Sequence, residues 1–154
     1  MFRGKTSVAL DSKGRMAIPT KYRGKLKEVC DGQLVVTRHP TDKCLLLYPL
    51  CIWETKEQIL NSAPSHDPRT AYVQRVVIGN ASDCEMDSQG RILIPENLRS
   101  YAKFEKSLAL VGLVGRFEIW NSQTWDDCFN TDAADAEEAI TSLADVPGLK
   151  NFTF

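Results

Sequence analysis

The sequence predicts a mainly β fold with flanking helices, in which two tandem repeats of one chain pack together as a small β-barrel. The first observation is an internal repeat, since Asp11–Arg15 (DSKGR) returns as Asp87–Arg91 (DSQGR). The second is that short β-prone runs flank both copies, and a further strand pair follows each copy. The third is size, because each half offers about four short strands with one apolar face, and such a sheet needs a second layer. Pairing the halves about a pseudo-two-fold axis covers both faces and removes unpaired strand edges.

The repeat extends beyond the turn. Residues 8–23 align without gaps with residues 84–99 and share seven identities. An internal repeat decides the architecture before any single element does. The identical pairs are Asp11/Asp87, Ser12/Ser88, Gly14/Gly90, Arg15/Arg91, Ile18/Ile94, Pro19/Pro95 and Arg23/Arg99.

Local chemistry predicts the elements of the first repeat. Asp11 suits the first position of a type I turn and Gly14 the left-handed position after it, so residues 6–10 and 15–18 should form a β-hairpin. Pro19 can open a short helix, because the first helical residue needs no N–H group. Strands over residues 33–37 and 44–48 and a helix over about 51–61 complete this repeat.

A polar linker, Asn61–Pro68, separates the two halves. Asp67 is a predicted N-cap and Pro68 the first residue of a helix that ends near Gly79. The pattern then restarts. We predict strands at 82–86 and 91–94, a helix at 95–102, strands at 107–111 and 116–120, a helix after Asn121, an acidic helix at 132–145 and a tail at 147–154.

These elements predict four segments. The two repeats pack together as one domain, and the last segment is a C-terminal helix and tail. The boundaries are 5–53 for the first repeat, 54–80 for a helical connection, 81–126 for the second repeat and 127–154 for an acidic C-terminal helix and tail. A chain of 154 residues is close to the common size of a single domain.

The net charge of −1 gives no overall attraction to DNA or to an anionic membrane, but the charges are unevenly distributed. Residues 1–30 carry eight cations and two acidic residues, whereas residues 121–154 carry one cation and seven acidic residues. This asymmetry suggests a basic surface for a polyanion and an acidic end that faces elsewhere. Two solvated faces that complement each other explain it equally well.

The other residue patterns exclude several classes of protein. Five scattered cysteines without a Cys-x-x-Cys motif are typical of reduced, buried thiols and not of a disulfide framework. His39 and His66 have no convincing ligand set, so we expect neither a metal nor another cofactor. The N-terminus lacks a signal peptide, and the longest apolar run is too short to span a bilayer, which needs roughly 20 residues. We therefore expect a soluble, cytoplasmic protein.

Turn geometry explains Asp and Gly in the repeated motif but leaves Arg15 and Arg91 unexplained. Pseudo-symmetry would place both arginines on one surface, which suits phosphates or guanine edges of a DNA duplex. The alternative is that each Arg forms an ion pair with the Asp four residues before it. Standard catalytic and nucleotide-binding motifs are absent from the sequence, so we expect no enzyme.

The sequence resembles the MraZ family. The resemblance covers essentially residues 1–130 and is carried by Met1–Gly4, the two Asp-x-x-x-Arg copies with their following Ile-Pro, Leu46–Pro49 and Glu118–Trp120. MraZ proteins are similar to the SpoVT-AbrB (AbrB-like) swapped-hairpin DNA-binding proteins, with both copies of the hairpin in one polypeptide. The resemblance implies the double-split, swapped-hairpin barrel of that family.

The resemblance also implies a function. It implies a bacterial transcriptional repressor of the division and cell-wall gene cluster, which binds repeated boxes in double-stranded promoter DNA. The protein would act on the nucleoid as a homo-oligomeric ring, an octamer or a dodecamer, without a small-molecule substrate. The implied DNA-surface residues are Asp11, Arg15, Asp87 and Arg91, to which Lys13, Arg3 and Lys5 would add attraction for phosphates.

Two other functions remain open at this point. AbrB-like barrels also form the DNA-binding halves of antitoxins, and the acidic tail with Phe152 and Phe154 could bind a partner protein. Paired arginines could also serve an enzyme that acts on a phosphorylated small molecule.

Overall fold

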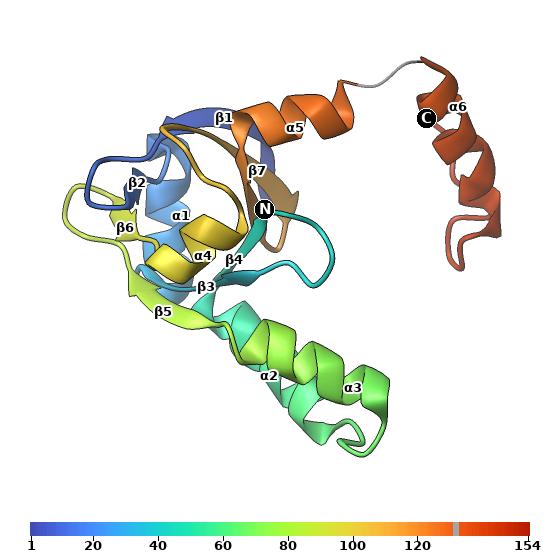
Figure 1. Cartoon of the computed structure of the whole chain (residues 1–154), viewed down its shortest axis with the longest axis horizontal. Helices are drawn as coiled ribbons and strands as arrows, with labels where there is room; N and C mark the ends of the chain where they lie inside the picture. Colours follow the sequence, from blue (N-terminus) through green and yellow to red (C-terminus); the bar gives the residue numbers. More distant parts are fainter. Residues whose placement is uncertain (131–132) are drawn as a thin grey trace. The chain divides into compact units, whose positions relative to one another are not determined.

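The computed structural model describes residues 1–130 and 133–154, and the chain divides into two compact units. The first unit is Met1–Ser122 and contains all the β-strands (Figure 1). The second is Gln123–Phe154 and is helical. The prediction of a mainly β fold with helices is confirmed.

Six antiparallel strands form the main sheet, in the order β1-β7-β8-β4-β3-β5. Their bounds are β1 Phe2–Ala9, β3 Gln33–Arg38, β4 Leu45–Pro49, β5 Ser82–Glu85, β7 Ser107–Val114 and β8 Phe117–Asn121. Three strand pairings in this sheet join one repeat to the other: β1 with β7, β4 with β8, and β3 with β5. Neither repeat could therefore form this sheet without the other.

A second sheet consists of only two short strands, one from each repeat: β2 (Arg15–Ala17) and β6 (Arg91–Leu93). We call this pair the ribbon. The ribbon continues β1 through one turn and β5 through the other, so it joins the two edges of the six-stranded sheet (Figure 1). No direct strand pairing between β1 and β5 is present among the described residues, so the closed barrel that the sequence predicted is not found there.

The two predicted hairpins are right in their turns and wrong in their strand pairing. In the first turn, Asp11 N–H donates to Arg15 O at 2.9 Å, and an isolated bridge joins Leu10 to Met16. The ladder partner of β2, however, is β6. Strands of three residues gain little from a local partner, and the exchange buries Met16 and Ile92 together in the core. The arms of the hairpins are therefore swapped between the repeats, as the AbrB-like resemblance implies.

The main core lies beneath the ribbon. Its aromatic centre is Phe117, whose ring centroid is 4.5 Å from that of Phe2 and 5.0 Å from that of Tyr22. Tyr22 lies on helix α1 (Thr20–Cys30), and Leu98 of helix α4 (Glu96–Tyr101) packs into the same core. The two short helices therefore cover the core directly after the ribbon strands that precede them.

A second apolar cluster lies on the other face of the sheet. Helix α2 (Leu50–Ser62) supplies Trp53, and the π-helix η1 (Gln74–Ile78) supplies Val77, which pack with Val35 and Tyr48 of the central strands. Helix α3 (Pro68–Val73) precedes η1, and its Asp67 cap accepts from Arg69 N–H at 2.9 Å as predicted. Strand β3 is therefore buried on both faces, which explains its continuous apolar sequence.

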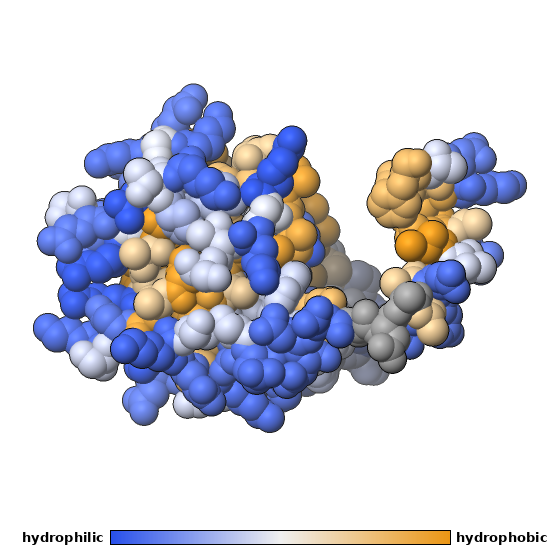
Figure 2. Space-filling model, turned by 90° about the horizontal axis from the view of Figure 1, so that it is seen from above, coloured by the Kyte–Doolittle hydropathy of each residue, from blue (hydrophilic) through white to orange (hydrophobic). Residues whose placement is uncertain are grey.

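The C-terminal unit contains helix α6 (Ala133–Thr141) and the 3₁₀-helix η2 (Ser142–Asp145), while helix α5 (Ser122–Phe129) begins directly after Asn121. The predicted acidic helix is confirmed from residue 133 onward, and Asp132 lies outside the described residues. This unit exposes large apolar side chains, which Figure 2 shows in orange at the right. They are Phe129, Ile140, Val146, Phe152 and Phe154.

The cysteines only partly follow the prediction of buried thiols. Cys44 and Cys84 are buried, and burial raises the pKa of Cys84 to about 12. Cys51 and Cys128 are exposed, which makes the prediction wrong for these two.

Two further features are absent from the part of the chain that the structure describes. No helix there is long and apolar enough to cross a membrane. The same residues contain no cluster of three or more His, Cys, Asp or Glu side chains that could hold a metal ion.

Candidate nucleic-acid interface

The ribbon brings Arg15 and Arg91 onto one outward face. In its antiparallel ladder Arg15 lies opposite Leu93, and Ala17 lies opposite Arg91. Directly opposed residues and residues two apart share a face, so Arg15, Ala17, Arg91 and Leu93 all point to the same side. The middle pair, Met16 and Ile92, points inward and is buried. The two arginines are diagonal neighbours, with backbones roughly 7–8 Å apart in standard sheet geometry.

Each arginine is held by the aspartate of its own turn. Arg15 Nε donates to Asp11 Oδ2 at 2.8 Å, and Arg91 Nε donates to Asp87 Oδ2 at 3.0 Å. The ion pair that the sequence left open as an alternative is therefore present in both copies. A guanidinium carries five N–H donors, and this bond uses only one of them. The ion pair thus orients the arginine without consuming its capacity to bind a ligand.

The aspartates also shape the turns through their second oxygen. Asp11 Oδ1 accepts from the backbone N–H groups of Lys13 and Arg15, at 2.9 and 2.8 Å. Asp87 Oδ1 accepts in the same way from Gln89 and Arg91, at 2.9 and 2.8 Å. The backbone N–H of the arginine is the largest cause that lowers the pKa of each carboxyl, and the arginine side chain adds to it. Both aspartates are therefore firmly ionised at neutral pH.

These two carboxyls should make the protein less stable in acid. Their folded-state pKa lies below the ordinary value of 3.8, so each contributes stability above that value, which is lost as pH falls through the folded pKa. In Asp11→Asn/Asp87→Asn an amide oxygen can still accept from the backbone, but the titrating charge is gone. We expect the urea concentration at the unfolding midpoint to fall less for the variant than for the wild type between about pH 5 and pH 3. Equal losses would contradict the assignment.

The repeated arginines eight residues further on cross over between the repeats. Arg23 lies against the Gly90 turn and donates through Nε to Ile18 O at 2.7 Å. Arg99 lies against the Gly14 turn and donates through Nε to Ile94 O at 3.0 Å. Each turn of the interface is therefore supported from beneath by a side chain of the other repeat. The sequence repeat identified Arg23 and Arg99 as an equivalent pair. Their crossed positions follow only from the pairing of β2 with β6.

The remaining predicted site residues are spread over a wider surface. Lys13 lies exposed in the first turn, beside Arg15. Arg3 and Lys5 are also exposed but lie on β1, opposite Leu113 and Val111 of β7. At about 3.3 Å per residue, Arg3 is roughly 26 Å along the chain from Asp11, where the first turn begins. Asp11, Arg15, Asp87, Arg91 and Lys13 thus form one group, and Arg3 and Lys5 lie outside it.

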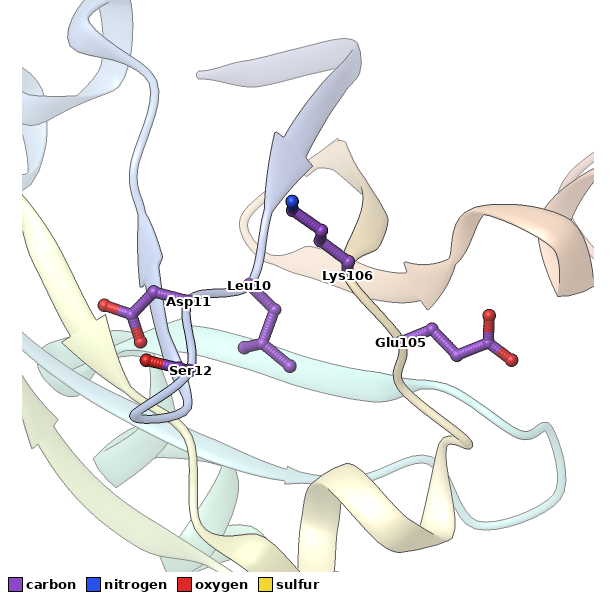
Figure 3. A pocket seen from close by; sticks show the side chains of 5 residues that line it. All are labelled: Leu10, Asp11, Ser12, Glu105 and Lys106. Atoms are coloured by element: carbon purple, nitrogen blue, oxygen red, sulfur yellow. The ribbon is translucent and has the colours of Figure 1, made fainter.

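A shallow hollow of about 440 Å³ adjoins the first turn and is lined by Leu10, Asp11, Ser12, Glu105 and Lys106. Figure 3 shows the Leu10 side chain pointing toward residues 105–106, while the Asp11 carboxylate points away from them. Leu10 N–H donates to Lys106 O at 2.9 Å, which fixes this edge. The carboxylate is committed to Arg15, so the hollow presents mainly an apolar wall.

Sequence reasoning missed the apolar residues of the interface. Leu93 is an exposed large apolar side chain, and Ala17 is exposed beside it on the outward face. The available signal was the period of two along a strand, which places Leu93 on the same face as Arg91.

Comparisons with known proteins agree with the duplicated organisation. A sequence model of one protein family, described as "MraZ protein, putative antitoxin-like", matches residues 1–76 and again residues 77–145. Each match contains one copy of the Asp-x-x-x-Arg turn.

Curated relatives named "Transcriptional regulator MraZ" match most of the chain. The protein of Nitrosospira multiformis is 51% identical over 126 residues, 82% of this chain and 85% of the relative. That of Haemophilus influenzae is 53% identical over 125 residues, with 81% and 83% covered. That of Nitrosococcus oceani is 44% identical over 141 residues, with 92% and 95% covered. These names describe regulators and not enzymes, in agreement with the sequence prediction, and the chain belongs to the MraZ family.

Proposed function

We propose that this protein is a DNA-binding transcriptional repressor that places its ribbon in the major groove of promoter DNA. One observation carries the proposal: the exchange of β2 and β6 sets Arg15 and Arg91 on one outward face, each oriented by its own aspartate. The names of the relatives support regulation of transcription.

The dimensions and chemistry of the ribbon suit duplex DNA. The major groove admits a two-stranded β-ribbon, and an arginine can donate two hydrogen bonds to O6 and N7 of guanine. The aspartate at Nε leaves other donors of the guanidinium to face a base. Lys13 in the turn, and Arg3 and Lys5 on β1, would add contacts to phosphates, which position a protein without reading sequence.

A single protomer with net charge −1 should bind DNA weakly, despite its basic first 30 residues. We propose that several protomers in a ring engage several promoter boxes at once, so that avidity supplies the affinity. The targets would be boxes before the division and cell-wall gene cluster that contains the protein's own gene, and the protein would act on the nucleoid. The ring and these targets extend the family resemblance to this chain.

The contact assignment is tested by a gel shift with a promoter fragment that carries several boxes. Arg15→Ala should weaken binding at least about fivefold, since one bidentate contact to guanine is worth about 1–3 kcal/mol. Arg69→Ala is the matched control, because Arg69 also forms an Arg–Asp ion pair, with Asp67 at 2.8 Å, but lies on α3 outside the ribbon. Equal binding by wild type and Arg15→Ala would refute the assignment.

The avidity proposal has its own test. Wild-type protein should bind DNA with several boxes far more tightly than DNA with one box, and scrambling the spacing should remove much of the gain. Native mass spectrometry of the free protein would give the number of protomers. A monomer, or indifference to the number of boxes, would refute the ring model and leave the contact assignment intact.

A protein-binding, antitoxin-like function is the second candidate. The family description contains the word "antitoxin-like", and the acidic C-terminal unit exposes Phe152 and Phe154, which contact each other at 5.0 Å between ring centroids. This function predicts a second chain that copurifies at fixed stoichiometry and is lost in Phe152→Ser/Phe154→Ser. Purification of a single species with unchanged DNA binding in that variant would exclude it.

A further inference from the structure

We infer that Leu93 is a specificity-determining residue that contacts the C5-methyl group of a thymine next to the base contacted by Arg15. The inference rests on the proposed DNA-binding function and adds a second kind of chemistry to the same face. The observation behind it is an exposed leucine at one end of the ribbon, on an outward face whose other residues are Arg15, Ala17 and Arg91.

The exposure of Leu93 follows from its position in the ribbon. Leu93 is 57% exposed, whereas its neighbours Ile92 and Ile94 are 1% and 0% exposed. Single exposed leucines are common on protein surfaces and need no explanation by themselves. Leu93 differs because it lies directly opposite Arg15 in the ladder. Directly opposed residues have Cβ atoms about 4.5–5.5 Å apart, so Leu93 and Arg15 would meet the same or adjacent base pairs.

The chemistry of the major groove supplies one apolar partner. Among the base edges in that groove, only thymine presents a methyl group, and apolar side chains contact it. A leucine directly opposite Arg15 therefore adds recognition of thymine to recognition of guanine. Burial of its exposed side chain against the methyl group would also remove apolar surface from water, which favours binding.

The pseudo-symmetric position gives an internal comparison. Ala17 occupies in the first repeat the place that Leu93 occupies in the second, and it lies opposite Arg91. The alanine side chain has three fewer carbon atoms and reaches less far from the ribbon. The two ends of the ribbon are thus alike in their arginines and unlike in their apolar contact. Recognition of the thymine methyl should be strong beside Arg15 and weak beside Arg91.

The test combines variants of the protein with the removal of a single methyl group from the DNA. The probe is a short duplex that carries one copy of the sequence that wild-type protein enriches from a random library. Each thymine is replaced in turn by deoxyuridine, which lacks only the C5-methyl group. Binding is measured by fluorescence anisotropy for wild type, Leu93→Ala and Ala17→Leu. Leu93 is exposed, so Leu93→Ala should leave the fold intact.

We expect one deoxyuridine position to weaken wild-type binding about fourfold, the value for one methyl group removed from an apolar contact. Leu93→Ala should bind the unmodified duplex at least about fourfold more weakly and be indifferent to that same replacement. Ala17→Leu should gain sensitivity at a second thymine position. Equal deoxyuridine effects in wild type and Leu93→Ala would overturn the inference.

The same experiment separates this inference from the proposed function. If Arg15→Ala abolishes binding but no deoxyuridine position matters, the ribbon contacts DNA and the role of Leu93 is overturned. If wild type enriches no sequence at all, the proposed sequence-specific binding fails, and the inference fails with it.

Discussion

Replacement of both ribbon arginines by lysine is expected to remove most of the discrimination between box DNA and random DNA. Arg15→Lys/Arg91→Lys keeps the positive charges but loses the planar guanidinium that donates two bonds to guanine. Each such contact is worth about 1–3 kcal/mol, so the pair should cost about 2–6 kcal/mol of specificity. Affinity for random DNA should change little, because it depends on charge. The ratio of the two affinities in a competition gel shift measures the effect.

Two controls sharpen this result. Arg69→Lys makes the same chemical change at an Arg–Asp pair outside the ribbon and should leave the ratio unchanged. The slope of log affinity against log salt should stay nearly constant in the ribbon variant, since the number of neutralised phosphates is the same. A ribbon variant that keeps full discrimination would show that the arginines act only through their charge.

Gly90→Ala is expected to have the largest effect on stability, a loss of about 2–4 kcal/mol in the free energy of unfolding. Gly90 has a φ of 75°, where a Cβ atom is strained, and that Cβ would collide with the Nε and Cζ atoms of Arg23. Arg23 would have to leave Ile18 O, to which it donates at 2.7 Å. Denaturation by urea, followed by circular dichroism, measures the loss.

A glycine of the first repeat provides the matched control for Gly90→Ala. Gly24 lies within helix α1, and a Cβ atom there would meet nothing within 4 Å. Gly24→Ala should therefore raise stability by about 0.5–1 kcal/mol, the usual gain for alanine over glycine in a helix. In addition, Gly90→Ala should lower the free energy of unfolding less in an Arg23→Ala background than in the wild type, because Arg23→Ala removes the collision. An equal loss of stability in both backgrounds would mean that the strain lies in the turn backbone alone.

The gene duplication, the turns and the helix starts could be predicted from the sequence. Asp11, Gly14 and their second copies specify their turns through local hydrogen bonds and a left-handed glycine, and the structure contains both. Asp67 and Pro68 specify a helix start in the same local way. Such features depend on residues within one turn of chain, so they can be read directly from the order of amino acids.

The candidate site could be predicted only in part. The repetition of Arg15 at Arg91 indicated that both arginines serve the same purpose, and the ribbon places them on one face. The exposed apolar position of Leu93 was not predicted, nor was the crossed support of each turn by Arg23 and Arg99. The place of Leu93 opposite Arg15 and the crossed support both depend on which strand lies beside which, and that information is not local.

By itself, the sequence determined that this protein is a duplicated, mainly β chain with an aspartate and an arginine in each of two tight turns. Only the tertiary structure decided that the arms of the two turns exchange partners. A strand of three residues pairs equally well with a local or a distant partner, as far as its own hydrogen bonds are concerned. The choice is made by the core, where Met16 and Ile92 are buried together under the exchanged strands. Burial of apolar surface by residues far apart in the chain therefore set the geometry of the face that carries Arg15 and Arg91.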